Sequence, residues 1–578
     1  WEKYVLEHMI YGVDIDYKAI IVSSLTLTLS SLEHRPADMK LPSLIGQNLI
    51  HQNSLMNSVP YYLRKEIFED FKDDIKLLRR AKVNHQINFN EKREKLQQEF
   101  KKYVASTLNG ETEFLRVEAL EINLPEVFFD ENGYLIEDGG FDVIIGNPPW
   151  EKWKPNSDEF FSQYDDKYLS LGNSKKKKSR RVELFSRFQT LENKWKEYSE
   201  RYEKGSKYFS DSSNFKFQSW IVEGRKTSSD YNLYKISFER FMQNLNKEGH
   251  LSLLMPDALM SDLGATGLRH LIFEKNELKE FLSFVNSEKI FESVHSSYKF
   301  AVTTLVKSNS NSMSTDKAVN QSFKAFFYKQ ELSALQKEAE KLDYPLELVF
   351  AEPEKYSLFE PRSQVEFDLY RKIKLSYPPL LETKLFEVSN DFHRTNDSEF
   401  FHAFVEGEIP LYEGKLMEQF KISPSAPESV TFDAAARKTG DDFQTWRLGL
   451  RTVGESTNRR NLIAMLFPPN IVAANSLHMQ KNSSQMTISK KIYILGILNS
   501  YVLDFVLKKL ISRNINLTQL KQLPIPSADE FPYSDEITKL SKSLLKKNRK
   551  PYDELDKLLQ DEGMKSPTEF DDLPVESL

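Results

Sequence analysis

The sequence predicts an α/β domain that carries helical insertions and is followed by an α+β domain. Short apolar segments alternate with helical segments from residue 10 to about residue 310, as in domains built on a parallel sheet. The segment 141–145 is a continuous apolar run, which is typical of a strand buried on both faces of such a sheet. From about residue 386 to 526 the chain changes to short strand-like segments, turns and prolines.

The first two predicted strands each end in polar residues. Residues 10–13 form a short apolar segment that runs into Asp14 and Asp16, and residues 18–32 then have the character of a helix. A second strand is predicted near Leu49 and Ile50 and ends at Asn53. Residues 61–108 are rich in Lys, Glu, Gln and Leu and contain few glycines, which predicts long polar helices inserted into the domain.

The third predicted strand, 141–145, runs directly into the sequence Gly-Asn-Pro-Pro-Trp at 146–150. Residues 151–229 are aromatic, basic and rich in serine, and we interpret them as a second insertion. A helix over 232–245, a strand over 251–255, a helix over 268–280 and a strand over 301–306 follow.

These patterns predict the division of the chain. The first domain spans residues 1–310, with insertions at about 61–108 and 151–229. A connecting helical region, 311–385, leads to the α+β domain at 386–526, and residues 527–578 form a C-terminal helix and an acidic tail.

Composition excludes several classes of protein. The 578 residues are 40% hydrophobic and 28% charged, as in ordinary globular proteins, and contain no cysteine. Disulfide frameworks and thiolate-ligated metal sites are therefore excluded, and a reducing cytoplasm fits best. The most apolar stretch, 492–507, is too short to cross a bilayer comfortably, so we expect a buried helix there and no membrane partner.

The net charge of −6 does not exclude nucleic acid as a partner. Residues 551–578 contain nine acidic and two basic residues, a charge of −7, which leaves +1 for the rest of the chain. Basic clusters at 175–181, 508–513 and 546–550 could face phosphates, although each alone is also typical of a solvated charged surface.

The most informative motif is Asn147, Pro148, Pro149 and Trp150, at the carboxyl end of a predicted buried strand, where open α/β sheets bind their ligands. An exocyclic amine is a hydrogen-bond donor, and an asparagine carbonyl beside a proline backbone carbonyl offers it two acceptors. The two prolines restrict the backbone that aims these carbonyls. An adjacent aromatic ring can stack on a purine that has been flipped out of its helix.

With the strand before it, this motif resembles the signature of the gamma class of DNA adenine-N6 methyltransferases. The resemblance implies that Asn147 and Pro148 accept hydrogen bonds from the adenine N6 amine and that Trp150 stacks on the flipped base. It also implies a Rossmann-like methyltransferase sheet over residues 1–310 and direct transfer of a methyl group from S-adenosylmethionine, without a metal. An ordinary proline-rich turn is the alternative for the tetrapeptide alone.

The same resemblance assigns residues to the cofactor. Asp14 matches the family's acidic residue that binds the ribose hydroxyls of S-adenosylmethionine, and Ile15 would pack on the cofactor adenine. The third element, usually an aspartate, falls at Asn53, where a carbonyl oxygen replaces the carboxylate. Asp14 could equally be the N-terminal cap of the following helix.

A later family element places an aromatic residue against the other face of the flipped base. Phe291 fits it best, with Tyr298 and Phe300 as rivals, and an ordinary core aromatic is the alternative interpretation of each.

The second half of the chain resembles the target-recognition part of large restriction–modification methylases, the type IIG, type IIL and BREX-like enzymes. The segments that carry this resemblance are 410–415, 451–460, 495–500 and 523–526. It implies double-stranded DNA as the partner. Arg451, Arg459 and Arg460 could contact phosphates or guanine edges, and structural ion pairs are the alternative for them.

One family element is absent from the sequence. The glycine-rich loop that approaches the methionine part of the cofactor normally precedes the position of Asp14, and no Gly-x-Gly occurs anywhere in the chain. We therefore expect an N-terminal segment or a partner chain to carry this loop, and the same segment or chain could also carry a nuclease or helicase. We expect the chain alone to bind the cofactor weakly. Two alternatives stay open: a DNA-recognition component with a vestigial methylase half, and a protein glutamine or RNA adenine methyltransferase.

Overall fold

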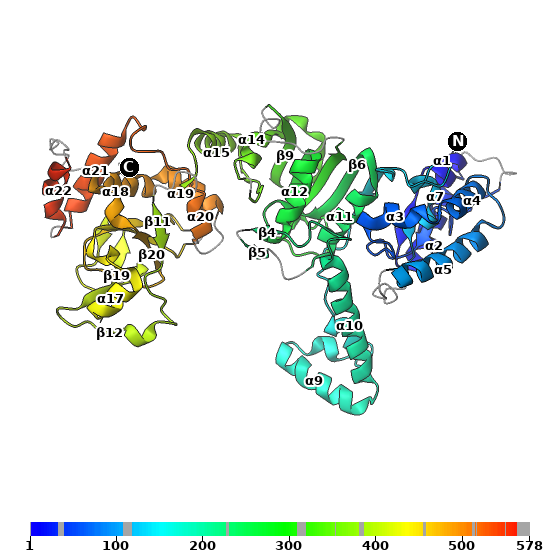
Figure 1. The fold of residues 1–578 in the computed structure, drawn as a ribbon, viewed down its shortest axis with the longest axis horizontal. Coiled ribbons are helices and arrows are strands. Elements are labelled where there is room, and N and C mark those ends of the chain that lie inside the picture. The colour runs from blue at the N-terminus through cyan, green and yellow to red at the C-terminus, as the bar shows by residue number, and fades with distance from the viewer. Residues whose placement is uncertain are drawn as a thin grey trace. The chain divides into compact units, whose positions relative to one another are not determined.

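A computed structural model describes most of the chain. The described residues are 2–32, 40–107, 118–222, 224–226, 231–308, 320–352, 354–380, 386–454, 458–510, 515, 517–548 and 551–562. The chain divides into two compact units, Trp1–Leu358 and Phe359–Leu578, and each is described by itself (Figure 1). The predicted α/β class is confirmed in its general form, because the first unit is built on a mixed six-stranded sheet.

The central sheet of the first unit has the strand order β10-β9-β7-β8-β6-β3. Its strands are β3 (Phe141–Gly146), β6 (Leu245–Pro256), β7 (Asn276–Val285), β8 (Lys299–Lys307), β9 (Ser322–Lys329) and β10 (Leu342–Pro345). β3 pairs with β6 in parallel, and so does β7 with β9, whereas the other neighbours are antiparallel. The parallel pair β3 and β6 therefore brings the ends of both strands to one edge of the sheet.

A separate parallel pair is formed by β1 (Gly12–Asp14) and β2 (Leu49–His51). The helix α1 (Glu2–His8) precedes it, and α2 (Tyr17–Ser30) connects its strands. Asp16 begins α2, because its side chain accepts a hydrogen bond from the backbone N–H of Lys18 at 2.9 Å. The acidic residue at the N-terminus of α2 is thus Asp16, and Asp14 lies two residues earlier, at the end of β1.

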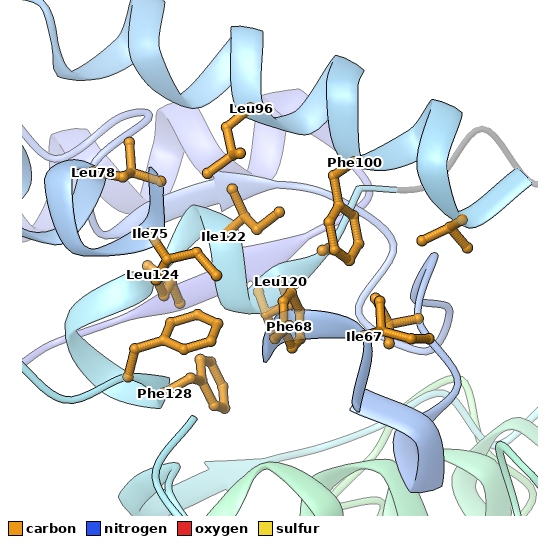
Figure 2. Close-up of a cluster of buried hydrophobic side chains, with 14 of the residues drawn as sticks. Ile67, Phe68, Ile75, Leu78, Leu96, Phe100, Leu120, Ile122, Leu124 and Phe128 are labelled. Carbon is orange, nitrogen blue, oxygen red and sulfur yellow. The ribbon is translucent and has the colours of Figure 1, made fainter. Parts of the chain in front are cut away.

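The predicted first insertion, 61–108, belongs to a bundle of helices with its own apolar core. Within the predicted bounds lie η1 (Tyr61–Leu63), α3 (Arg64–Glu69), α4 (Lys72–Val83) and α5 (Phe89–Thr107), and beyond them α6 (Leu120–Asn123) and α7 (Pro125–Phe128) complete the bundle. Figure 2 shows Phe68, Ile75, Leu96, Phe100 and Phe128 converging between these helices. Aromatic and aliphatic side chains at helical spacing close the core, so the polar residues of the insertion remain outside.

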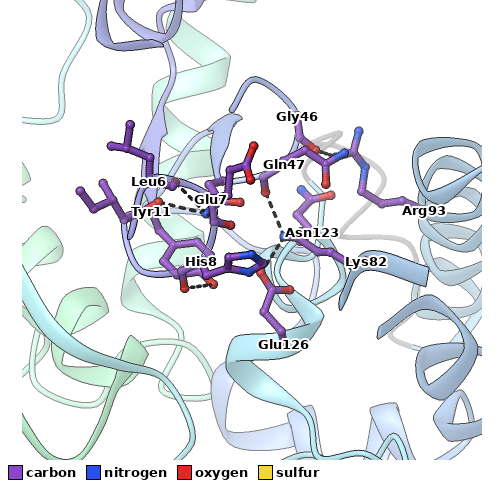
Figure 3. Close-up of polar contacts among 12 residues, drawn as sticks. Leu6, Glu7, His8, Tyr11, Gly46, Gln47, Lys82, Arg93, Asn123 and Glu126 are labelled. Atoms are coloured by element: carbon purple, nitrogen blue, oxygen red, sulfur yellow. Dashed lines mark hydrogen bonds and ion pairs between the residues drawn. The ribbon is translucent and has the colours of Figure 1, made fainter. Parts of the chain in front are cut away.

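A buried cation joins this bundle to the β1–β2 pair. The Lys82 ammonium, 6% exposed, donates hydrogen bonds to the carbonyls of Gln47 at 2.9 Å and Asn123 at 3.2 Å and pairs with Glu126 Oε1 at 2.8 Å (Figure 3). Burial lowers the pKa of Lys82. The lysine is fully coordinated by groups from both sides, as a buried charge requires.

The second insertion is largely helical, although its sequence showed little periodicity. It contains α8 (Ser157–Ser162), η2 (Tyr168–Ser170), α9 (Ser174–Arg187) and α10 (Leu191–Ser210), and Figure 1 shows α9 and α10 projecting away from the sheet. A small aromatic core, which includes Phe160, Phe161, Tyr168, Leu184 and Leu191, holds these helices together. The periodicity is weak in the sequence because few positions of each helix are buried.

The rest of the first unit departs from prediction in two places. The helix predicted over 268–280 ends earlier, since α12 spans Thr266–Lys275 and β7 begins at Asn276. The sheet also continues past residue 310, where the sequence predicted the end of the domain, because β9 and β10 join it beside β7. The polar stretch 308–317, which suggested a boundary, lies outside the described residues except for Ser308.

The remaining elements of the first unit are short strands, helices and turns. They are β4 (Ile221–Val222), β5 (Arg225–Lys226), α11 (Leu233–Asn244), η3 (Asp257–Met260), η4 (Leu263–Ala265), η5 (Asn286–Glu288), η6 (Leu332–Gln336), η7 (Glu338–Glu340) and α14 (Leu346–Phe350).

The second unit combines small sheets with helices, as the α+β prediction expected. One sheet has the order β11-β20-β17-β18 and another β12-β16-β13-β19. Its strands are β11 (Glu387–Ser389), β12 (His402–Ala403), β13 (Ile409–Tyr412), β14 (Met417–Glu418), β15 (Lys421–Ile422), β16 (Glu428–Val430), β17 (Arg447–Arg451), β18 (Ala464–Phe467), β19 (Val472–Ala473) and β20 (Leu477–Lys481). Its α-helices are α15 (Gln364–Ser376), α17 (Phe432–Thr439), α18 (Ile488–Leu498), α19 (Tyr501–Leu510), α20 (Leu517–Lys521), α21 (Ser534–Lys546) and α22 (Leu555–Asp561). Short 3-10 turns η8 (Ser398–Phe400), η9 (Gly414–Leu416), η10 (Asp442–Gln444), η11 (Ser483–Gln485) and η12 (Tyr552–Glu554) complete the unit.

The apolar stretch 492–507 is two helices rather than one. Asn499 lies between α18 and α19, where its side chain exchanges two hydrogen bonds of 3.0 Å with the backbone of Ala464 in β18. This contact ends α18 and fixes it on the sheet. In the part of the chain that the structure describes, no helix has the length and apolarity needed to cross a bilayer.

Phe100→Ala should destabilise the first unit by about 3–5 kcal/mol, because the ring is fully buried and stacks on Phe68 with centroids 5.1 Å apart. Leu77→Ala is the matched control, since Leu77 in α4 is 56% exposed and should cost less than about 0.5 kcal/mol. Urea unfolding of the two variants measures both effects. Equal losses would contradict the assignment of this core.

Candidate active site

The Asn-Pro-Pro-Trp motif lies immediately after β3, at the carboxyl end of the parallel pair β3 and β6. Gly146, the last residue of β3, is paired with Leu253 of β6. Asn147 is exposed, Pro148 is buried, and the Asn147 amide makes no hydrogen bond to any described residue. The motif therefore presents a free amide group at the edge of the sheet where ligands bind in open α/β folds.

The three rival aromatic residues all gather around Trp150. The Trp150 ring lies 5.7 Å from Tyr298 at an interplanar angle of 10°, 5.7 Å from Phe291 at 72° and 6.3 Å from Phe300 at 26°. The indole N–H of Trp150 donates to the carbonyl of Leu254 at 3.4 Å. The fold thus places Trp150 beside aromatic residues that are about 150 positions later in the chain.

These aromatic residues differ in how much surface they offer to a ligand. Phe300 is 1% exposed and Phe291 is partly buried against the same core, whereas Tyr298 is 40% exposed. Both the backbone N–H and the carbonyl of Phe291 are hydrogen-bonded at 2.9 Å to the side chain of the buried Asn286. Tyr298 is therefore the most accessible ring beside Trp150, whereas the hydrogen bonds to Asn286 fix the backbone of Phe291.

A buried acid at this edge was not singled out from the sequence. Asp257 directly follows β6, as Asn147 follows β3, and it is 5% exposed. Its Oδ2 pairs with the Lys299 ammonium at 2.8 Å and accepts a hydrogen bond from the Ser283 hydroxyl at 3.1 Å. Burial, and secondly the charge of Asp257, raises the pKa of Tyr298. The sequence feature that could have identified Asp257 is an acidic residue placed directly after a predicted strand.

A second ion pair joins the helix α11 to the segment that follows β6, where Asp262 begins η4. Lys235 is 3% exposed and its ammonium lies 2.6 Å from Asp262 Oδ2. Hydrogen bonds from Lys235 lower the pKa of Asp262, although burial alone would raise it. The described residues contain no group of three or more His, Asp or Glu side chains arranged to hold a metal ion.

The proposed cofactor residues lie together at the ends of β1 and β2. The backbone N–H of Gln52 donates to the Asp14 carbonyl at 2.9 Å, so Asp14 and Asn53 follow adjacent parallel strands at the same edge. One oxygen of Asp14 accepts from the backbone N–H of Asp16 at 2.7 Å, and Ile15 is 62% exposed. A carboxylate beside an exposed aliphatic side chain fits the ribose and adenine of a nucleoside.

Two sheet edges next to this region carry exposed apolar side chains. β1 pairs only with β2, and β3 only with β6, among the strands of the described ranges. Val143 and Ile145 of β3 are 60% and 77% exposed, and Val22 and Leu25 of α2 are 61% and 57% exposed. The prediction that the strand 141–145 is buried on both faces is therefore wrong for the described residues, because β3 is an edge strand. Exposed apolar side chains on such an edge are typical of an interface rather than of a solvated face.

The three arginines proposed for DNA lie in the second unit and differ in their surroundings. Arg451 donates through Nε to the Val453 carbonyl at 3.3 Å, and Arg460 donates to the Asn499 carbonyl and stacks 4.0 Å from the Tyr501 ring centre. Burial lowers the pKa of Arg460. Arg459 is exposed. Arg451 and Arg460 thus have structural contacts within the unit, and a role of any of the three in DNA binding stays a prediction.

Comparison with known proteins identifies the class of the first unit. Residues 8–196 and 190–291 match the model of the Eco57I restriction-modification methylase family. These residues contain β1, β2, β3 and the Asn-Pro-Pro-Trp loop described above. The region 8–291 of this chain therefore belongs to the Eco57I restriction-modification methylase family. No curated protein matches the chain.

Several solved restriction–modification enzymes resemble the chain in structure. A nuclease-deletion mutant of the type ISP enzyme LlaGI in complex with a DNA substrate mimic is 10% identical, with 94% of this chain and 41% of that chain covered and a TM-score of 0.34. The DrdV–DNA complex is 9% identical, with 94% and 51% covered and a TM-score of 0.34. The type IIL enzyme MmeI in complex with DNA is 11% identical, with 74% and 55% covered and a TM-score of 0.31. The chain spans about half the length of these enzymes.

The helix under the site predicts a pH dependence of stability. Glu239 of α11 is 1% exposed and accepts hydrogen bonds from the backbone N–H groups of Lys216 at 2.7 Å and Phe217 at 3.2 Å. Burial raises the pKa of Glu239 from 4.5 to about 7, although these hydrogen bonds oppose the shift. Because the folded pKa is the higher one, the stability that Glu239 contributes is present below about pH 4.5 and is lost as the pH rises through about 7.

Glu239→Gln should remove this loss, so that the variant loses about 3 kcal/mol less stability than the wild type between pH 4.5 and 7. Unfolding in urea at the two pH values measures the difference. Glu131→Gln, which makes the same charge change at an exposed position, should behave as the wild type. An unchanged pH dependence in Glu239→Gln would refute the assignment.

Proposed function

We propose that the chain is the catalytic and target-recognition part of a site-specific DNA adenine-N6 methyltransferase that depends on S-adenosylmethionine and serves a restriction–modification or phage-defence system. The observation that carries the proposal is the free amide of Asn147, which follows β3 at the carboxyl end of the parallel pair, in the same loop as Trp150, whose ring stacks on Tyr298. Membership of residues 8–291 in a methylase family supports it.

The sheet order supports a Rossmann-like methyltransferase fold. The order β2-β1 in one sheet and β3-β6-β8 in the other leaves one edge of β1 and one edge of β3 without a described partner. The rings of Tyr11, before β1, and Phe141, at the start of β3, are 5.6 Å apart, so the two sheets approach each other at these strands. One further parallel strand between them would give an order similar to that of dinucleotide-binding sheets, with the first strand at the centre.

The residues of the loop have distinct tasks in this proposal. The Asn147 Oδ1 and the Pro148 carbonyl accept the two N–H groups of the adenine amine, which leaves its lone pair free to attack. Trp150 and Tyr298 hold the flipped base by stacking on it. Alignment of the amine supplies much of the acceleration, because the reaction needs only the approach of two bound groups in line.

S-adenosylmethionine supplies, when bound, a sulfonium methyl group for the amine to attack, with S-adenosylhomocysteine as the leaving group. Asp14 would hold the ribose hydroxyls, Ile15 would pack on the adenine, and the Asn53 carbonyl would accept from the adenine amine. The methionine end requires a glycine-rich loop. We propose that this loop follows the strand that pairs with β1 and β3 and that an N-terminal segment or a partner chain provides it, since its pairing satisfies both free edges and covers Val143 and Ile145.

In the complete enzyme, which includes the glycine-rich loop, Asn147→Ala should lower the rate of methyl transfer to adenine by a factor of at least about a hundred to a thousand. Sequence-specific DNA binding should stay largely intact, because the change removes an acceptor at the reaction centre only. Radiolabelled methyl transfer to duplex DNA, with a parallel binding titration, measures both properties. Trp150→Ala is the companion variant and should be milder, since stacking holds the base without aligning the amine. Activity within tenfold of the wild type in Asn147→Ala would sink the assignment, and a greater loss in Trp150→Ala would overturn this division of roles.

Sequence choice should reside in residues 386–526, because contacts of the loop with a flipped adenine cannot report on the neighbouring bases. Exchange of this segment with that of a relative of different specificity should move the methylated site. Sequencing of the modified bases detects the change, and methylation of the original site by an active exchanged protein would refute this division of the chain.

A further inference from the structure

The helical hairpin that follows the Asn-Pro-Pro-Trp loop, residues 151–210, is the most basic part of the first unit's surface. It contains fifteen Lys and Arg against ten Asp and Glu, a net charge of +5 in a chain whose total charge is −6. The helix α9 alone carries seven basic residues and one acidic residue. The excess charge is therefore concentrated in a single helix of the hairpin.

Five of the seven basic residues of α9 fall into two kinds. Lys177 lies 2.6 Å from Asp158 Oδ2, and Arg180 lies 2.7 Å from both Asp165 and Glu183, so these two cations stabilise the hairpin itself. Lys175, Lys176 and Lys178 are exposed and have no ion pair with any described residue. We call these three lysines the outer basic face of α9.

The outer basic face is unfavourable for the isolated protein. Its three ammonium groups lie within one turn and repel one another, and no acidic residue occurs in the first turn of α9. Cations there also oppose the positive end of the helix dipole. Neither packing nor pairing within the described residues compensates for this cost, which indicates an external polyanion as the partner.

The hairpin is joined rigidly to the catalytic loop. Trp153, three residues after Trp150, donates through Nε1 to the carbonyl of Tyr202 in α10 at 2.8 Å. Its ring packs so closely on Gly205 that a Cβ there would come within 2.4 Å of it. Tyr208 of α10 accepts a hydrogen bond from the Asn57 backbone N–H at 3.0 Å, close to the end of β2. The hairpin is thus bonded both to the segment that follows the Asn-Pro-Pro-Trp loop and to the segment that follows β2.

We propose that the outer basic face of α9 binds the phosphate backbone of duplex DNA beside the flipped adenine. The inference rests on the proposed function for the nature of the substrate. The hairpin leaves the sheet directly after the loop that receives the base, so the anionic surface next to that loop is the backbone that flanks the target. Charge complementarity without base contacts predicts that this face contributes affinity and register but no sequence choice.

The test is the salt dependence of DNA binding by the full chain carrying Lys175→Gln, Lys176→Gln and Lys178→Gln together. Glutamine is a good helix former, so α9 should remain folded. The slope of log Kobs against log salt concentration should become less negative by about 2 to 3, because each lost phosphate contact removes about 0.9. Affinity for a short duplex of arbitrary sequence at physiological salt should fall about tenfold to a hundredfold.

The matched control is the triple change Lys65→Gln, Lys76→Gln and Lys102→Gln, which removes the same charge from exposed positions of α3, α4 and α5. It should leave the slope close to that of the wild type. A wild-type slope in the α9 variant, or an equal change in the control, would overturn the proposal. The readout is binding and not methyl transfer, so DNA binding through α9 by a complete enzyme that methylates no adenine would contradict the proposed function alone.

Discussion

The parallel pairing of β3 with β6 is the constraint on which the candidate site depends. Because both strands run in the same direction, Asn147 after β3 and Asp257 after β6 come to the same edge of the sheet. Residues that follow β7 and enter β8 then complete the cluster, since β8 lies next to β6. The strand order thus places a free amide, a buried acid and an aromatic cluster at one edge of the sheet, although they come from segments about a hundred or more residues apart in the sequence.

The insertions use this scaffold in different ways. The first closes a separate apolar core of its own and is tied to the β1–β2 pair by the buried Lys82. The second stays attached to the segment after the Asn-Pro-Pro-Trp loop through Trp153 and carries its excess charge outward. Closing a long insertion at the end of a strand costs little additional conformational entropy when the insertion folds into its own structure. The sheet can therefore carry surfaces that its core does not provide.

Some elements of the fold match the sequence prediction and others do not. Predicted strands at 10–13, 49–50, 141–145 and 301–306 all exist, because continuous apolar runs that end in polar residues are a local signal. The helix predicted over 268–280 ends at Lys275 instead, and within the insertion predicted over 151–229 the sequence did not locate the helices α9 and α10. In both places tertiary contacts decide the structure: β7 is a strand because β8 and β9 flank it, and the hairpin is held by aromatic residues that no period reveals.

The sequence by itself determined the alternation of strands and helices, the position of the Asn-Pro-Pro-Trp loop after an apolar strand, and the acidic end of the first strand. These features follow from short-range patterns of side-chain polarity. Only the tertiary structure decided that Tyr298 rather than Phe291 is the accessible ring beside Trp150, that Asp257 joins the edge, and that β1 and β3 each keep one edge without a described partner. These facts depend on strand order and burial, which are set by packing between segments more than a hundred residues apart.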